Sequence, residues 1–244
     1  MKKTLLLVAL LVAASVTVAS AAGINLSWGN KCFADGEVSS LNWACTNNTF
    51  TGAKMTCSFA IAASKTNFVA TDLYLEAVTN DAGTLIPDWW KLGAGECRAN
   101  NIGIVTDASI ATGGGCVDPW GSGTVGGGGI GLYSDDTNRA HLNASWASPD
   151  PIALDGGVET FAAQFKVLAA KTTGTGACAG CLTPLTWALN YIQVAYQGEA
   201  SSEVLSTPIA GGVQCLTYQG GTAPCSRPVP ARNSTWGQVK SLYR

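Results

Sequence analysis

Residues 186–196, Thr-Trp-Ala-Leu-Asn-Tyr-Ile-Gln-Val-Ala-Tyr, decide the fold class of this chain. Alternation places Leu189 and Tyr191 on one face of an extended stretch, and Ile192 and Val194 on the other. A strand with apolar residues on both faces is typical of the centre of a sheet that lies between two layers. The stretch therefore predicts a layered β protein.

Further strands are predicted on both sides of this stretch. Apolar and polar residues alternate with period two at 69–76 and 161–169, the pattern of strands with one buried face. Shorter strand candidates lie at 24–28, 56–62, 101–106, 130–133, 141–146 and 213–218. Only residues 87–92 and the C-terminus have helical character. We therefore expect an all-β, disulfide-stapled β-sandwich, immunoglobulin-like or jelly-roll, with a short C-terminal helix.

Ten glycines fall within residues 113–131, four of them in a row. Glycine costs about 1 kcal/mol relative to alanine in a helix, so this segment is not helical. We interpret it as a long loop. A domain boundary and a place where backbone closely approaches a ligand are the alternatives.

The N-terminus has the pattern of an export signal. Lys2 and Lys3 precede an apolar run at 5–18, and small residues follow at 19–22, which predicts cleavage after Ala21 or Ala22. The apolar run is shorter than the ~20 residues of a membrane-spanning helix, which disfavours a membrane anchor. We expect a secreted, periplasmic or cell-surface protein with no membrane span after cleavage.

The expected organisation has three parts. Residues 1–22 are the signal peptide and residues 23–223 the β-sandwich domain. Residues 224–244 are a Pro-rich spacer and a helical tail, in which Trp236, Val239 and Leu242 fall on one side. The tail either docks on the sandwich or is recognised by a sorting or assembly machine.

The charge content excludes two classes of partner. Charged residues make up 12% of the chain, where about 25% is usual. Without the signal, 12 basic residues stand against 16 acidic ones. Nucleic acids and anionic membranes both require clustered Lys and Arg, so we expect neither as a partner.

Cysteines follow the signal at nine positions: Cys32, Cys45, Cys57, Cys97, Cys116, Cys178, Cys181, Cys215 and Cys225. In an oxidising compartment they are expected to form disulfides. Proximity along the chain predicts Cys32–Cys45, Cys97–Cys116, Cys178–Cys181 and Cys215–Cys225, although eight cysteines allow about 105 connectivities. Cys57 is left as a buried free thiol, with an intermolecular disulfide as the alternative.

Three loop tryptophans are the candidate ligand-binding residues. Trp89 and Trp90 follow Pro87-Asp88, and Trp120 follows Asp118-Pro119. Exposed rings at such positions can stack on a sugar ring or anchor a protein partner. The alternative is that they cover the ends of the sandwich.

Catalytic signals are weak. Cys178-Ala179-Gly180-Cys181 has the spacing of a thiol–disulfide motif but lacks the helix that activates one, so a loop staple is favoured. A glycosidase would need two paired carboxylates. The candidates are Asp72, Glu76, Asp88, Asp118, Asp155 and Glu159. His141 is interpreted as a polar surface residue. No metal site is expected, although the acidic turns near Asp135 and Asp155 leave Ca²⁺ open.

The opening Gly23-Ile24-Asn25-Leu26-Ser27-Trp28, the cysteine layout and the ending Thr-Trp-Gly-Gln-Val-Lys-Ser-Leu-Tyr-Arg at 235–244 resemble a set of uncharacterised secreted bacterial proteins. The resemblance covers about a third of the chain. It implies an exported β protein and brings no assigned activity and no functional residues.

The sequence favours a non-catalytic extracytoplasmic protein with a binding or assembly role. A polysaccharide or another surface protein is the expected partner, and no cofactor is expected. The enzyme alternatives are an extracellular glycan hydrolase with paired carboxylates and a thiol–disulfide protein that uses Cys178 and Cys181.

Overall fold

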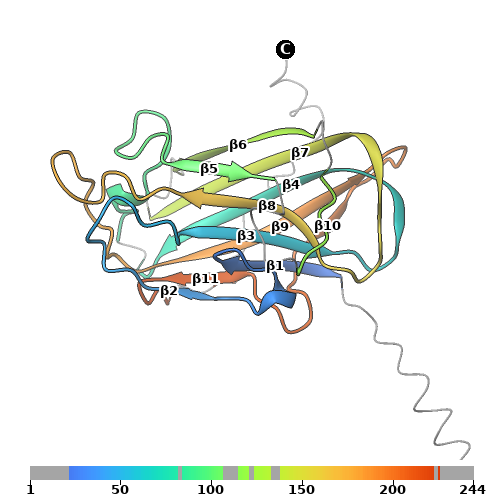
Figure 1. Cartoon of the computed structure of the whole chain (residues 1–244), viewed down its shortest axis with the longest axis horizontal. Helices are drawn as coiled ribbons and strands as arrows, with labels where there is room; N and C mark the ends of the chain where they lie inside the picture. Colours follow the sequence, from blue (N-terminus) through green and yellow to red (C-terminus); the bar gives the residue numbers. More distant parts are fainter. Residues whose placement is uncertain are drawn as a thin grey trace, which may run out of the picture.

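The strands form two sheets that pack face to face, with the smaller sheet in front in Figure 1. The computed structural model describes residues 22–81, 84–106, 115–120, 124–132, 138–222 and 225, and only the backbone of 129–132. The predicted signal peptide, apart from Ala22, and the predicted C-terminal helix lie outside these residues. Across the described ranges, no helix has the length and apolar character needed to cross a membrane.

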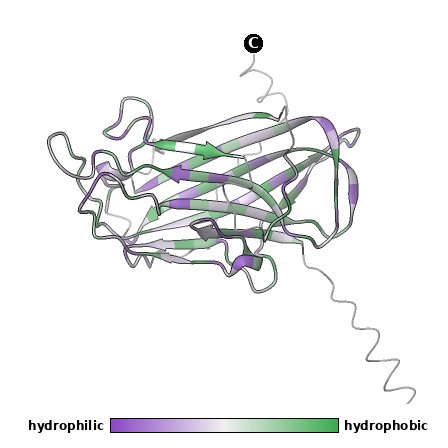
Figure 2. Cartoon of the chain, viewed as in Figure 1, coloured by the Kyte–Doolittle hydropathy of each residue, from purple (hydrophilic) through white to green (hydrophobic). Residues whose placement is uncertain are grey.

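The smaller sheet has four antiparallel strands in the order β1-β3-β8-β5. Their bounds are β1 Gly23–Trp28, β3 Lys54–Ala60, β8 Thr160–Val167 and β5 Ile102–Val105. All four coincide with stretches that the sequence predicted as strands. Figure 2 shows hydrophobic and hydrophilic residues interspersed along them.

The larger sheet has the order β2-β11-β9-β4-β7-β6, and β10 also pairs with β9. Its bounds are β2 Ser40–Leu41, β11 Cys215–Tyr218, β9 Leu185–Tyr196, β4 Lys65–Thr79, β7 Arg139–Leu154, β6 Val125–Leu132 and β10 Glu203–Leu205. Short 3-10 helices cover Phe33–Asp35 (η1) and Asp88–Trp90 (η2). The strand predicted at 186–196 thus lies inside its sheet, as expected.

Aromatic residues join the two sheets. The rings of Phe59 on β3 and Phe68 on β4 are 6.2 Å apart. Trp28 on β1 lies 6.4 Å from Tyr218 on β11, and its Nε1 donates to the Thr217 carbonyl at 3.0 Å. Burying each such side chain contributes about 2–3 kcal/mol. This shared core confirms the predicted all-β sandwich.

A β-bulge alters the predicted faces of β9. Tyr191 lies opposite Tyr74 but Leu189 lies opposite Leu75, so Asn190 is the extra residue. Leu189 and Ile192 both face the core, and Tyr191 points outward. The sequence had placed Leu189 and Tyr191 on one face, because simple alternation contains no bulge.

The glycine-rich loop prediction is wrong for residues 125–129, which lie in β6 and pair with β7. The separate strand prediction at 130–133 is confirmed for residues 130–132, the end of the same strand. Glycine fits here because Trp146 of β7 occupies the space of a side chain. A Cβ at Gly126 would lie 1.7 Å from Trp146 Cε3, whereas a Cβ at Gly127 would meet nothing within 4 Å. The backbone pairing with β7 therefore stabilises a strand whose glycines have low β propensity.

Three of the four predicted disulfides are wrong. The structure pairs Cys32 with Cys116, Cys45 with Cys181 and Cys97 with Cys178. Only Cys215–Cys225 is as predicted. The three long bridges span 84, 136 and 81 residues, because the sandwich brings loops from distant parts of the chain together.

Cys57 is free and fully buried in β3, which confirms the expectation of an unpaired core thiol. Burial raises the pKa of this thiol. A neutral thiol in this setting packs as a small apolar side chain.

Candidate functional site

The three candidate tryptophans lie in the core. Trp89 and Trp90 are 0% and 1% exposed, and Trp120 is 8% exposed. Trp89 Nε1 donates to Thr172 Oγ1 at 2.9 Å, and Trp120 Nε1 donates to the Ala162 carbonyl at 2.8 Å. A ring that stacks on a ligand must be accessible, so this location is at odds with a binding role. The rings close the ends of the sandwich instead.

Arg98, which sequence reasoning missed, supports this aromatic cluster. Its guanidinium lies 3.7 Å from the centre of the Trp89 ring. It donates to the carbonyls of Trp89 at 2.7 Å and Ala170 at 3.0 Å. Burial lowers the pKa of Arg98 to about 10, which still leaves it protonated at neutral pH. Arg98 therefore fixes the η2 segment to the chain that follows β8.

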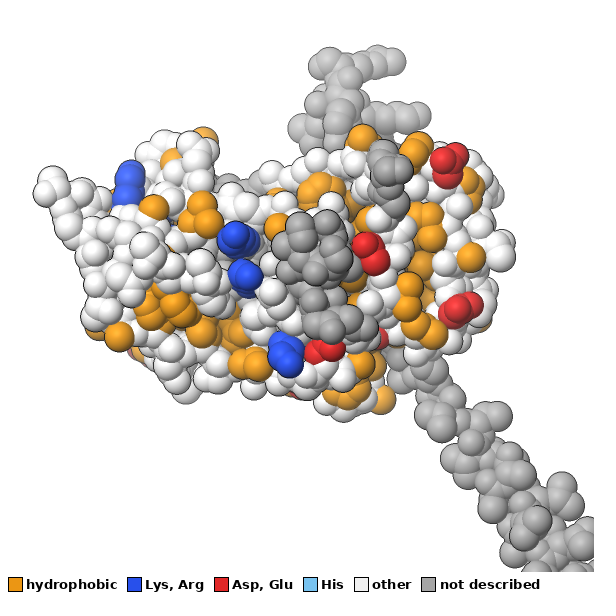
Figure 3. Space-filling model, viewed as in Figure 1, with side chains coloured by type: hydrophobic (Ala, Val, Ile, Leu, Met, Phe, Trp, Pro, Cys, Tyr) orange, Lys and Arg blue, Asp and Glu red, His pale blue; other side chains and the backbone are white. Residues whose placement is uncertain are grey.

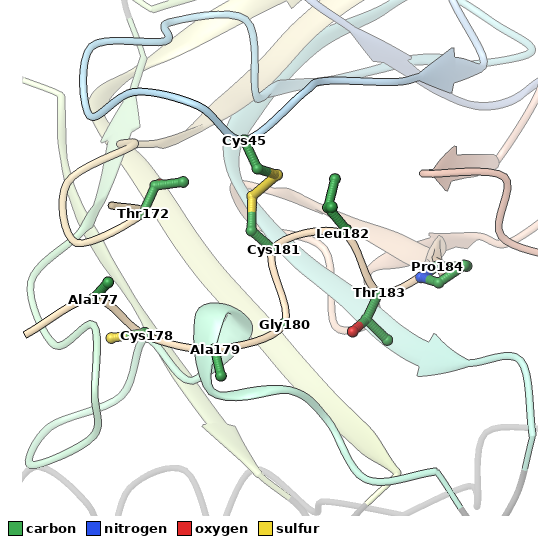
Figure 4. Close-up of a pocket in the computed structure, with 10 residues that line it drawn as sticks. All are labelled: Cys45, Thr172, Ala177, Cys178, Ala179, Gly180, Cys181, Leu182, Thr183 and Pro184. Atoms are coloured by element: carbon green, nitrogen blue, oxygen red, sulfur yellow. A yellow bond between two sulfur atoms is a disulfide. The ribbon is translucent and has the colours of Figure 1, made fainter. Parts of the chain in front are cut away.

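Cys178 and Cys181 do not pair with each other. Figure 4 shows the Cys45–Cys181 disulfide, with the Cys178 sulfur directed elsewhere, toward its own partner Cys97. The loop borders an open depression of about 630 Å³ lined by the disulfides and by small or uncharged residues such as Ala179 and Thr183. The spacing is that of a staple to two other segments, and no dithiol is available for exchange within the motif.

Three of the candidate carboxylates, those of Asp88, Asp118 and Glu159, have structural partners, and Asp155 makes a backbone contact in a turn. Asp88 pairs with Lys91 at 2.7 Å, and Asp118 accepts from the Trp120 amide at 2.9 Å. Glu159 accepts from the Phe33 and Ala34 amides at 2.9 and 3.1 Å, at the start of η1. The Asp155 carbonyl accepts from the Val158 amide in a turn. These contacts identify the four residues as turn and cap residues.

Within the described ranges, one group of three potential metal-ligand atoms occurs, made of Cys32, Cys116 and Glu159. The two sulfurs are joined in a disulfide and do not supply thiolates. The acidic turn at 135–136 lies outside the described residues. The group around Glu159 is therefore structural.

The remaining two carboxylates, Asp72 and Glu76, belong to a surface that sequence analysis did not predict. On β4, Leu73 and Leu75 are buried in the core, so Asp72, Tyr74 and Glu76 point to the other side of the larger sheet. Strand pairing adds outward-facing residues from β7 and β9 beside them. We call this surface the outer face, and it consists of Asp72, Tyr74, Glu76, Arg139, His141, Asn143, Ser145, Asn190, Tyr191 and Gln193.

Three rings form a row across the outer face. Tyr74 and Tyr191 have centroids 5.7 Å apart and planes 6° from parallel, and Tyr74 and His141 are 6.0 Å and 15° apart. All three side chains are partly exposed. Parallel, offset rings on three neighbouring strands make a terraced aromatic surface.

Polar groups border the ring row at Asp72. Ser145 Oγ donates to Asp72 Oδ1 at 2.7 Å, and the Tyr191 hydroxyl makes a longer contact of 3.4 Å to Oδ2. Burial raises the pKa of the Asp72 carboxyl above its usual value, and the hydrogen bonds from Ser145 and Tyr191 oppose that shift. These contacts hold the carboxylate beside the rings.

On the other side of Tyr74, Glu76 forms an ion pair with Arg139. Asn190 Nδ2 also donates to Glu76 Oε2 at 3.3 Å. The four-residue spacing places the Asp72 and Glu76 Cα atoms about 13 Å apart along the strand. The carboxyl groups of a glycosidase pair lie about 5–9 Å apart. Both side chains leave the strand on the same side, and Glu76 is already paired with Arg139, so this spacing does not favour a catalytic pair.

Comparison with known proteins adds no relative: no family model matches the sequence, and no curated protein matches it. The outer face is therefore interpreted from its own geometry.

Proposed function

We propose that this is a secreted or surface-exposed, non-catalytic protein that binds polysaccharide through the outer face of its larger sheet. The observation that carries the proposal is the row of partly exposed rings formed by Tyr191, Tyr74 and His141. The signal-like N-terminus and the four disulfides support the extracytoplasmic location.

The chemistry of the outer face suits a sugar. A pyranose ring offers apolar C–H faces that pack on aromatic rings, and hydroxyl groups that need hydrogen-bond partners at the edges. Asp72, Asn143 and Gln193 supply carboxylate and amide groups next to the rings. The outer face thus offers rings for stacking on a sugar and polar groups for hydrogen bonds to its hydroxyl groups.

Low charge density supports an uncharged ligand. Figure 3 shows the side of the molecule that carries the smaller sheet, opposite the outer face, where a few Lys, Arg, Asp and Glu side chains lie among mostly uncharged ones. The sequence has 12% charged residues in total. A neutral polysaccharide needs no basic patch, unlike a nucleic acid or an anionic membrane.

The test is affinity electrophoresis of the protein through gels that contain neutral or acidic polysaccharides. Tyr74→Ala and Tyr191→Ala should each lower the affinity for the retarding polysaccharide about tenfold, a loss of about 1.4 kcal/mol of binding free energy. Leu182→Ala, which removes an exposed apolar side chain from the loop before β9, is the matched control. Unchanged retardation in both tyrosine variants, with thermal stability preserved, would refute the proposal.

A further inference from the structure

The outer face is also the surface from which the chain leaves the sandwich. Cys215 lies opposite Ala188 on β9, and Ala188 in turn lies opposite Glu76 on β4. The Cys215–Cys225 disulfide, with Cα atoms 5.8 Å apart, therefore holds residue 225 at this face. The C-terminal segment starts two strands away from Glu76.

Contacts before Cys225 show the same path. A Cβ at Gly221 would lie 2.0 Å from the Leu185 carbonyl oxygen, so the chain passes directly against the start of β9. The Thr222 amide donates to Asn80 Oδ1 at 2.8 Å, just beyond the end of β4. Outward-facing Thr186 is only 2% exposed at this end. The chain after β11 thus runs along the outer side of the larger sheet.

The segment that follows has the opposite charge to the rest of the protein. Residues 226–244 contain four basic side chains and no acidic ones, whereas residues 22–225 contain eight basic and sixteen acidic ones. The basic residues are Arg227, Arg232, Lys240 and Arg244. Two carboxylates lie where such a segment could meet them: Asp72 on the outer face, and exposed Asp81 just beyond the end of β4. A cationic segment within a Debye length of a carboxylate is attracted to it, and salt of 1 M shortens that length to about 3 Å.

We propose that residues 226–244 dock on the outer face of the larger sheet as an intramolecular partner, with their basic side chains toward Asp72 and Asp81. From β11 to β7 the face spans three inter-strand steps of about 4.8 Å, or about 14 Å. Nineteen residues reach about 28 Å even as a helix. Trp236 and Tyr243 provide aromatic surface for the ring row.

This inference goes beyond the proposed function, because the partner is the chain itself. A docked segment shields Tyr74 and Tyr191 from solvent. The rate at which a reagent in solution oxidises these two tyrosines then scales with the fraction of molecules whose segment is undocked.

The first test is zero-length carbodiimide cross-linking of the full chain, mapped by mass spectrometry. Lys240 is the only lysine after Cys225. It should couple to Asp72 or Asp81 within one molecule, and coupling should fall in 1 M salt. Asp118 and Asp155 lie on loops that connect the smaller sheet to the larger one. Predominant coupling of Lys240 to either of them would overturn the proposal.

The second test compares hydroxyl-radical footprinting of the full chain with a chain that ends at Cys225. If the docked fraction is about 90%, oxidation of Tyr74 and Tyr191 should rise about tenfold on truncation. Buried Tyr196 is the internal reference. The full-length variant R232Q/K240Q/R244Q should reproduce most of the rise, and Asn233→Gln should not. Equal oxidation in the full and truncated chains would refute docking.

Neither measurement uses a polysaccharide. A failure of docking therefore leaves the proposed function standing, whereas absent polysaccharide binding by both the full and the truncated chain counts against the proposed function alone.

Discussion

The carboxylate of Glu76 and the guanidinium of Arg139 form an ion pair that is almost fully shielded from solvent, although both residues are on the outward side of the larger sheet. Removing one partner of a buried pair leaves a charge without compensation. Arg139→Met should therefore lower the free energy of unfolding by about 3–5 kcal/mol.

The double variant E76M/R139M separates the charge effect from packing. It should be markedly more stable than R139M alone, because no buried charge remains. Urea unfolding of the three proteins measures both differences, and equal losses in the single and double variants would contradict the prediction.

The β6 glycines predict a contrast between neighbouring positions. Gly126→Ala should destabilise the protein by about 1–3 kcal/mol, because the new Cβ collides with the Trp146 ring. Gly127→Ala faces open space and should change stability by less than about 1 kcal/mol. Thermal unfolding of both variants checks the order, and similar midpoints would show that β6 does not pack as described.

The raised pKa of Asp72 predicts a pH effect of definite sign. The folded state holds the Asp72 proton more tightly than the unfolded state, so this group makes folding less favourable as pH rises through its folded-state pKa. Relative to Asp72→Asn, the wild type should lose stability as pH increases from about 3 to 7. Urea midpoints of both proteins across this range test it, and a constant or opposite difference would contradict a pKa raised by burial.

The disulfides should contribute unequally to the free energy of unfolding. Cys45–Cys181 closes a span of 136 residues and Cys215–Cys225 one of 10. Loop entropy makes C45A/C181A about 2 kcal/mol more destabilising than C215A/C225A. Chemical unfolding compares them, and peptide mapping of the unreduced protein should recover both pairs. Recovery of a Cys178–Cys181 peptide instead would show a different connectivity.

Much of the fold was predictable from the sequence because strand alternation is local. The stretches at 69–76 and 186–196 lie wholly in strands, that at 161–169 lies in β8 as far as Val167, and the short turn near 87–92 contains η2. The strand at 125–129 was missed because glycine has low β propensity, whereas its pairing with β7 and the space that Trp146 takes beside Gly126 are not visible in the local sequence. Three disulfides were missed for the same reason, since their partners are neighbours only after the sheets pack.

The candidate site was harder to predict. Asp72, Tyr74 and Glu76 were correctly placed on one side of a strand, but nothing in the sequence shows that His141 and Tyr191 lie beside them. That depends on the order of β9, β4 and β7 and on the bulge at Asn190. The loop tryptophans were proposed instead because a loop position suggests exposure. In the structure, Arg98 and Tyr218 pack against the Trp89 ring, which is buried in the core.

The overlapping bridges constrain how the native connectivity is reached. A chain that emerges from its N-terminus exposes Cys45 soon after Cys32, and Cys116 soon after Cys97, yet neither of these neighbours is a native pair. Cys45 and Cys97 must wait for Cys181 and Cys178, which precede β9. Correct oxidation thus needs either late thiol pairing, after most strands have emerged, or an isomerase that rearranges early bonds.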